Sequence, residues 1–146
     1  MVNEVHYRRL ERMYLEANIN KKMFDTTTAE IGYEYAKIGL KITDKYFHAL
    51  GAIHGNVYFK LLDDAAFFAV NSIVEDAFVL TTSFNINIIR PANHGKIMAT
   101  GKVKYKSRNL FIADSSLVNE AGKEIAFGSG TFVKSRATLT KEIGYQ

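Results

Sequence analysis

Residues Gly51–Val74, GAIHGNVYFKLLDDAAFFAVNSIV, decide the architecture of this chain. The segment opens with a glycine-flanked turn and then runs from Asn56 past Ile73 without glycine or proline, which predicts a helix with Asn56 as its N-cap. Apolar side chains occupy almost every face of this helix, and a helix without a polar stripe is a buried one. Three alanines between residues 65 and 69 leave one side smooth enough for another layer to approach closely.

Two carboxylates, Asp63 and Asp64, lie in the middle of this apolar helix. Neighbouring helical residues point about 100° apart, so these two side chains meet different environments. Asp64 has Lys60 one turn earlier as an ion-pair partner. Asp63 has Phe59 and Phe67 one turn away on either side and no cation within helical reach. Because an unpaired carboxylate in an apolar wall is costly, Asp63 is either a hydrogen-bonded structural residue or a functional one.

The composition restricts the classes of protein that this chain can belong to. Its 146 residues predict one domain, residues 1–146. The absence of cysteine excludes disulfides and thiolate chemistry, and four scattered histidines give no metal-ligating spacing, so we expect no metal site. A net charge of +4 fits attraction to an anionic small molecule at least as well as to nucleic acid. Without a membrane-spanning or signal-like apolar segment, we expect a cytoplasmic protein with neither membrane nor nucleic-acid partners.

The rest of the chain reads as one helical segment followed by strands. Residues 1–24 form an N-terminal helical segment, residues 29–43 a strand region with a break at Gly39, and residues 137–146 a flexible tail without a core pattern. Alternating apolar and polar residues predict four further strands, at 78–90, 97–106, 110–118 and 123–134. This order predicts an α+β fold in which one antiparallel sheet curls around the central helix. Unprotected sheet edges favour pairing of two copies into a dimer.

Several motifs resemble the hotdog-fold acyl-CoA thioesterases of the phenylacetate-pathway (PaaI-like) family. His54–Asn56 followed by Leu62–Asp63 matches the spacing of the family's His-Gly-Gly…Asp signature, Arg90–Pro91 ends a strand as in the family, and Gly122–Ala126 matches near the end. The resemblance extends to about Ser135. It implies a hotdog fold, with a curved antiparallel sheet wrapped around a long central helix and an additional N-terminal helix.

The resemblance also implies roles for individual residues. The backbone N–H of Gly55, at the start of the helix, would stabilise the oxyanion that forms on the thioester carbonyl. The family's helix acid corresponds to Asp63 rather than Asp64, and it would act as general base or nucleophile. A hydroxyl that holds the attacking water in the family corresponds to Thr81, supplied by the facing subunit's strand.

Two positions depart from the family pattern. Asn56 replaces the second motif glycine, still offering a backbone N–H but adding bulk where the thioester approaches. His48 stands where the family commonly has an asparagine that contacts the thioester; its ring could donate the same hydrogen bond or act as an acid or base near neutral pH. We expect His54 to belong to the substrate-binding residues, with its ring bonding nearby backbone rather than acting in the chemistry.

For the nucleotide of coenzyme A, the resemblance indicates a surface between subunits near the turn at Ser107 and Arg108, with Arg90 as a further basic candidate. Coenzyme A is then part of the substrate, and no separate cofactor is expected. The same resemblance implies a homodimer, or a tetramer made of two dimers.

The leading hypothesis is hydrolysis of a small or medium acyl- or aryl-CoA thioester to the free acid and coenzyme A. One alternative is a non-catalytic acyl-thioester binding protein, a sensor or carrier, which would have no need of the unpaired Asp63. The other is a dehydratase or hydratase of the same fold that uses a histidine with an acid, and His48 keeps this alternative open.

Overall fold

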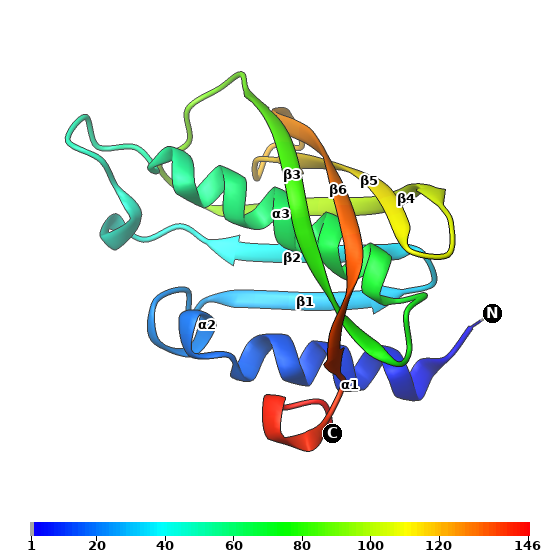
Figure 1. The fold of residues 1–146 in the computed structure, drawn as a ribbon. Coiled ribbons are helices and arrows are strands. Elements are labelled where there is room, and N and C mark those ends of the chain that lie inside the picture. The colour runs from blue at the N-terminus through cyan, green and yellow to red at the C-terminus, as the bar shows by residue number, and fades with distance from the viewer. Residues whose placement is uncertain (1) are drawn as a thin grey trace.

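The computed structural model describes residues 2–146, which form one curved sheet around one long helix (Figure 1). Two short helices precede the sheet, and the long central helix lies between its second and third strands in chain order. The elements are α1 (Glu4–Glu16), α2 (Asn18–Lys22), β1 (Thr27–Gly32), β2 (Tyr35–Lys41), a 3₁₀ turn (Asp44–Tyr46), α3 (Gly55–Asn71), β3 (Ala77–Ile88), β4 (Lys96–Lys106), β5 (Leu110–Val118), β6 (Glu124–Thr138) and a second 3₁₀ turn (Lys141–Ile143).

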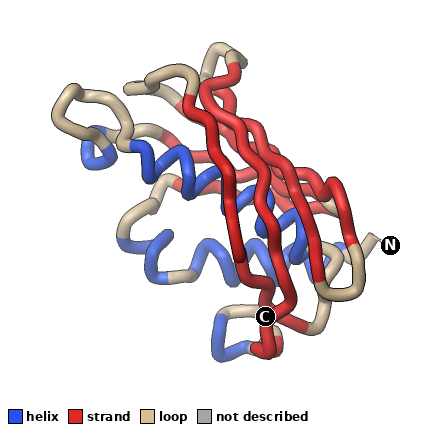
Figure 2. The backbone as a smooth tube through the Cα atoms, turned by 45° about the horizontal axis from the view of Figure 1, so that its top comes forward, coloured by secondary structure: helices blue, strands red, loops and turns tan. Residues whose placement is uncertain are grey.

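The six strands are all antiparallel and follow the order β1-β2-β4-β5-β6-β3. α3 contacts every strand from within the curve of the sheet, as Figures 1 and 2 show from two directions. The predicted α+β plan, one sheet curling around a buried helix, is therefore confirmed. None of the helices among residues 2–146 combines the length and the apolar character that crossing a membrane requires.

The smooth side of α3 meets the sheet at a single glycine. A β-carbon placed on Gly101 of β4 would lie only 2.2 Å from the backbone carbonyl oxygen of Ala65. Ala65 and Ala66 are both fully buried at this contact, and Ser115 of β5 donates a hydrogen bond of 2.9 Å to the carbonyl of Leu62 beside it. The expectation that small residues let another layer approach the helix closely is confirmed, and the contact fixes how α3 is rotated against the sheet.

The break in the first strand region lies at a different residue from the one predicted. β2 continues through Gly39, which pairs with Thr28 on one side and Met98 on the other. The chain instead reverses at Glu34, which adopts a left-handed conformation with φ of 56°. Glycine tolerates extended backbone as well as turns, so its presence alone did not locate the turn.

The C-terminal residues make contacts that the prediction of a flexible tail did not include. β6 extends to Thr138, and Leu139 is 8% exposed. Beyond it, the hydroxyl of Tyr145 bonds Nδ1 of buried His6 at 2.7 Å, while Nε2 of His6 bonds the backbone carbonyl of Asn71 at 2.8 Å. These contacts join the last residues to α1 and to the end of α3, which the short, weakly patterned segment did not indicate.

The two edges of the sheet are treated differently. At the β1 edge, side chains of α1 bond the exposed backbone: Arg8 donates to the carbonyl of Ile31 at 2.7 Å, and Glu11 accepts from its N–H at 2.8 Å. Within residues 2–146, no strand or helix pairs with the outer edge of β3. An open edge twelve residues long is a template for pairing with another chain.

Candidate active site

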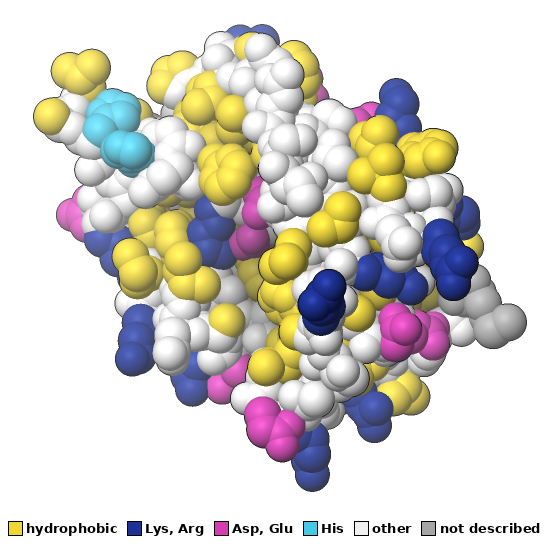
Figure 3. Space-filling view, viewed as in Figure 1, with side chains coloured by type: hydrophobic (Ala, Val, Ile, Leu, Met, Phe, Trp, Pro, Cys, Tyr) yellow, Lys and Arg dark blue, Asp and Glu magenta, His cyan; other side chains and the backbone are white. Residues whose placement is uncertain are grey.

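One stripe of α3 faces away from the sheet and forms the floor of a cavity of about 660 Å³. α1 and α2 bound this cavity on one side and β3 bounds it on the other. Figure 3 looks onto this face and shows hydrophobic side chains gathered around a few acidic atoms at the centre. The stripe carries Asn56, Phe59, Asp63 and Phe67 at three- and four-residue steps, so helix periodicity alone brings them to one surface.

Asp63 is the chemically distinctive residue of the cavity. Its Oδ1 accepts a hydrogen bond of 2.9 Å from the hydroxyl of Thr81. Burial raises the pKa of Asp63 from 3.8 to about 6; the Thr81 bond opposes that rise, the neighbouring Asp64 charge adds to it, and Lys60 lowers the pKa slightly. The carboxylate is therefore ionised at neutral pH but more basic than an ordinary aspartate, which is the property a general base needs. The expected lack of a paired cation at Asp63 is consistent with this environment.

A β-bulge in β3 aims Thr81 at Asp63. Thr81 pairs with Phe132 of β6, but Ser83 pairs with the next residue, Thr131, so Thr82 is an extra residue in the strand. The alternation that points Phe84 inward would by itself turn Thr82 inward and Thr81 outward. The bulge reverses this and turns the Thr81 hydroxyl toward the helix, a common use of bulges beside functional sites.

Thr81 reaches Asp63 within one chain. The expectation was a hydroxyl supplied by the facing subunit, and the structure differs in placing the intrachain pair at hydrogen-bond distance. The reason is the position of β3, which runs directly beside the exposed stripe of its own α3, as the shared cavity lining shows.

Asp64 belongs to a separate, internally satisfied polar cluster. Lys60 Nζ donates to Asp64 at 2.6 Å, to Asn20 Oδ1 at 2.7 Å and to the Tyr14 hydroxyl at 3.3 Å. The Tyr14 hydroxyl itself donates to Asp64 at 2.6 Å, and burial followed by the Asp64 charge raises the pKa of this phenol well above its usual value. The predicted pairing of Asp64 with Lys60 is confirmed. Tyr14 and Asn20 were not foreseen, and only the apolar stripe of the N-terminal helix hinted that α1 packs here.

The start of α3 offers one free backbone donor. His54, rather than Asn56, is the N-cap: its Nδ1 accepts from the N–H of Asn56 at 3.0 Å. The expected role of His54 as a backbone-bonding residue is confirmed, whereas the N–H of Asn56 is already used and is not available to a substrate. Among residues 2–146, the N–H of Gly55 has no acceptor. The positive end of the helix is thus exposed at Gly55.

A smaller hollow of about 350 Å³ lies at the start of α3, and its lining includes Gly55, His48 and Arg90. His48 Nδ1 accepts from the N–H of Leu50 at 3.1 Å, so a neutral His48 ring carries its proton on Nε2. Arg90 is anchored by its Nε, which donates to the carbonyl of Glu124 at 3.2 Å. Three of the predicted site residues, from three separate segments, are therefore brought together here.

Ser107 and Arg108 lie elsewhere in the chain. They form the exposed β4–β5 turn, where the Ser107 hydroxyl bonds the carbonyl of Leu110 at 2.9 Å. Lys106, next to this turn, bonds Glu34, whose N–H in turn bonds Ser72 at the end of α3. Figure 1 likewise shows the turn at the end of the molecule where α3 finishes. Within one chain the turn is thus remote from Gly55.

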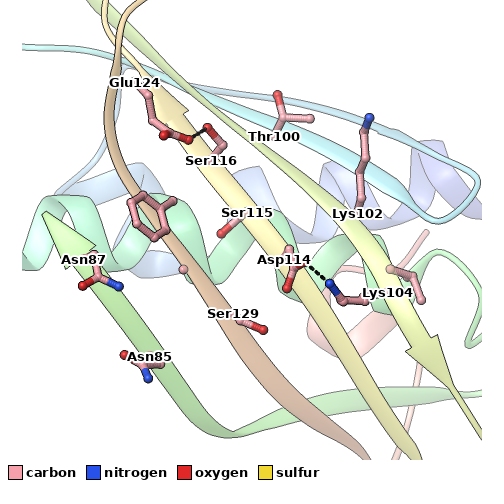
Figure 4. A pocket seen from close by; sticks show the side chains of 13 residues that line it. Asn85, Asn87, Thr100, Lys102, Lys104, Asp114, Ser115, Ser116, Glu124 and Ser129 are labelled. Atoms are coloured by element: carbon pink, nitrogen blue, oxygen red, sulfur yellow. Dashed lines mark hydrogen bonds and ion pairs between the residues drawn. The ribbon is translucent and has the colours of Figure 1, made fainter. Parts of the chain in front are cut away.

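The opposite face of the sheet carries a broad open hollow that is polar and contains none of the predicted site residues (Figure 4). Three of its charged groups have partners: Lys104 lies 3.6 Å from Asp114, and Ser116 donates to Glu124 at 2.5 Å. Across residues 2–146, no cluster of three or more histidine or acidic side chains is arranged to hold a metal ion.

Comparison with known proteins identifies the family of this chain. A family model described as the thioesterase superfamily matches residues 50–126, which include α3 and both Gly55 and Asp63. A protein of Saccharolobus solfataricus named as a candidate esterase is 25% identical over 104 residues, covering 71% of this chain and 69% of that protein.

Solved structures extend the match to the whole fold. The E. coli PaaI protein from the phenylacetic acid degradation operon superposes with a TM-score of 0.84 at 20% identity, over 96% of this chain and 100% of that one. A Streptococcus mutans protein bound to acetyl-CoA superposes with a TM-score of 0.70 at 18% identity, over 78% and 92%. The fold is thus of the hotdog type, as the resemblance to the PaaI-like proteins implied. Since the family model spans more than half of the sequence and includes the helix that presents the carboxylate, the chain belongs to the thioesterase superfamily.

Proposed function

We propose that this protein hydrolyses acyl-CoA thioesters, with Asp63 as general base or nucleophile and the N–H of Gly55 as oxyanion donor. The observation that carries the proposal is Asp63: a half-buried carboxylate without a paired cation, hydrogen-bonded to Thr81, with a pKa raised to about 6. Membership of the thioesterase superfamily and the acetyl-CoA bound to the Streptococcus mutans neighbour support the reaction and the substrate class.

Helix geometry indicates that two copies of the chain complete each site. Gly55 and Asp63 are eight residues apart on α3, which corresponds to about 12 Å along the helix axis. One thioester carbonyl cannot lie within about 3 Å of both groups. We therefore propose that Gly55 of one subunit faces Asp63 of a second subunit. The open edge of β3 supports this arrangement, because pairing two β3 edges would satisfy the backbone groups left exposed there.

In the proposed mechanism the thioester carbonyl oxygen accepts from the Gly55 N–H, where the positive helix end stabilises the developing negative charge. His48, which lines the same hollow, donates a second hydrogen bond through Nε2. The ionised Asp63 either removes a proton from the attacking water or adds to the carbonyl carbon itself, and Thr81 holds the carboxylate in position. The carbon–sulfur bond breaks and coenzyme A leaves as the thiolate. On the general-base route the attacking water has supplied the new oxygen and the acid is released directly; on the nucleophilic route water hydrolyses the mixed anhydride with Asp63, which releases the acid and restores the carboxylate.

The first test is release of free thiol from a panel of acyl- and aroyl-CoA substrates. We expect turnover on at least one substrate and a loss of about a hundredfold or more in Asp63→Asn, the scale of removing a general base. Asp64→Asn is a poor control because it breaks the Lys60 pair, so Asp114→Asn, an exposed carboxylate on the other face of the sheet, serves instead. Binding of the substrates without thiol release would instead support the sensor or carrier alternative.

The oxyanion donor is tested with a matched pair at Gly55. Gly55→Pro removes the N–H at the first helical position, where proline is tolerated, and His54 before it already has the extended conformation that proline requires. Gly55→Ala keeps the N–H, and its added β-carbon would make only an ordinary 3.7 Å contact with Ile88. We expect the proline variant to lose about a hundredfold or more in kcat and the alanine variant much less.

Mixing inactive variants tests the two-copy site. In a mixed dimer of Asp63→Asn and Gly55→Pro chains, one of the two sites combines an intact Gly55 with an intact Asp63. Random mixing should therefore restore roughly a quarter of the wild-type activity, since about half of the dimers are mixed and each has one good site. A site built within one chain would show no restoration.

A further inference from the structure

The cavity beside Asp63 is larger than a short acyl group needs. Its volume of about 660 Å³ falls within the range of roughly 300–1,000 Å³ that encloses drug-sized ligands. Five large hydrophobic side chains that remain more than 40% exposed all line it. These residues are Ile19, Met23, Phe59, Leu80 and Ile143. Exposed apolar surface that converges on one hollow marks a binding site rather than ordinary surface scatter.

Lys60, Asp64, Tyr14 and Asn20 of the cavity bond one another, whereas the reactive carboxylate with its threonine and the side chain of Asn56 stand outside this cluster. Lys60 has three acceptors, in Asp64, Asn20 and Tyr14, and the Tyr14 hydroxyl and the Asn20 amide each donate within the same cluster. The three donors of Lys60 and the Tyr14 hydroxyl are all engaged, and the second amide N–H of Asn20 is on a side chain that is only 2% exposed, so the cluster offers little to a polar group on a ligand. A ligand that enters between α1 and β3 therefore gains by burying apolar surface.

The length of the cavity limits the ligand. The α3 residues that line it run from Asn56 to Phe68, about 18 Å along the helix axis, with Asp63 about 10 Å from one end and about 7 Å from the other. A zigzag carbon chain built from bonds of about 1.5 Å advances about 1.3 Å per atom, so either arm accommodates about six to eight carbons. Aromatic side chains line these two parts of the cavity. Among them, the rings of Phe67 and Phe68 meet edge to face, with their centroids 4.9 Å apart.

From these features we infer that the cavity between α1–α2, α3 and β3 binds the acyl part of the substrate, and that the preferred acyl group is an apolar chain of about six to eight carbons. This inference rests on the proposed function and specifies its substrate class. The N-terminal segment supplies the wall of the acyl site, through Met13 of α1, Ala17 between the two helices and Met23 after α2, so this segment selects the substrate. Acetyl and other short acyl groups leave most of the cavity unfilled.

The test compares kcat/KM for acyl-CoA substrates from acetyl to palmitoyl, with phenylacetyl-CoA included. We expect kcat/KM to rise by up to about fourfold per methylene from four carbons upward and to stop rising at about eight. Ala17→Phe fills the cavity at an exposed position whose φ of −59° and ψ of 141° accept any side chain. This variant should lower the octanoyl-to-acetyl ratio of kcat/KM at least tenfold, whereas Ala121→Phe, in the exposed β5–β6 turn, should leave the ratio unchanged.

The outcomes separate this inference from the proposed function. Asp63→Asn should lower all substrates together, so it tests hydrolysis and leaves the ratio alone. If the wild type hydrolyses nothing, calorimetric binding of octanoyl-CoA and acetyl-CoA still tests the acyl site, which predicts tighter binding of octanoyl-CoA and loss of that preference in Ala17→Phe. A flat chain-length profile, or a preference for acetyl-CoA, overturns the inference. A change in solution mass in Ala17→Phe overturns the assignment of Ala17 to the acyl wall, because Ala17 then lies in a contact between subunits.

Discussion

Replacing Asp63 by asparagine should make the protein more stable above pH 6 while it lowers activity about a hundredfold or more. Burial raises the pKa of Asp63 from 3.8 to about 6. A difference of about two pH units corresponds to about 3 kcal/mol, at about 1.4 kcal/mol per unit. The folded protein bears this cost whenever the carboxylate is ionised. Asparagine is a neutral group of the same shape that can still accept the hydrogen bond from Thr81, so it removes the cost and keeps the packing.

The sign of the effect follows from proton linkage. Between pH 4 and pH 6 the folded state holds a proton on Asp63 that the unfolded chain has lost, so the contribution of this residue to stability falls as the pH rises through that window. Below about pH 4 both states are protonated, and Asp63→Asn should be about as stable as the wild type. Above about pH 6.5 the variant should be more stable by up to about 3 kcal/mol.

Urea unfolding of both proteins at pH 4 and pH 8, at equal protein concentration, measures this difference. Asp114→Asn, at a carboxylate that is 48% exposed, is the control and should change stability by less than about 0.5 kcal/mol at either pH. The reasoning is refuted if Asp63→Asn is less stable than the wild type at pH 8, or if its advantage is the same at both pH values. Either result would mean that the carboxylate is well solvated or satisfied in the folded protein.

Three further predictions follow from single contacts. Thr81→Val removes the hydroxyl that lowers the pKa of Asp63, so the acidic limb of the kcat/KM profile, which should fall with one proton near pH 6 in the wild type, should move to higher pH. Lys60→Met leaves Asp64 poorly compensated, and thermal or urea unfolding should show a loss of about 3 kcal/mol. Gly101→Ala forces a methyl group into the backbone of α3 and should cost at least about 2 kcal/mol, with much of the expressed protein insoluble.

Much of this fold could be predicted from the sequence because its central helix is unusual. An apolar helix with two adjacent carboxylates allows few interpretations, and the environments predicted for Asp63 and Asp64 from their neighbours four residues away are those that the structure shows. The strands from residue 78 onward alternate clearly, so their bounds differ from the prediction by only a few residues, β5 (Leu110–Val118) without any difference.

The missed features depend on contacts between distant parts of the chain. Tyr14 and Asn20 reach the Asp64 cluster across about forty or more positions of sequence, and no local pattern records such a pairing. The orientation of Thr81 depends on the bulge at Thr82, which breaks the alternation that periodicity relies on. The N-cap is His54 rather than the predicted Asn56, because the histidine ring accepts the hydrogen bond from the N–H of Asn56 two residues later.

The contact between β4 and α3 also bears on how this sequence can vary through evolution. At Gly39 an added β-carbon would meet only side chains, those of Thr28, Lys96 and Met98, so a second substitution that shortens a neighbour can make room for it. At Gly101 the obstacle is main chain, which every residue possesses, and no partner substitution can remove it. Gly39 can therefore be replaced when a neighbouring side chain is shortened at the same time. Gly101, in contrast, should resist replacement in any sequence that retains this sheet and helix.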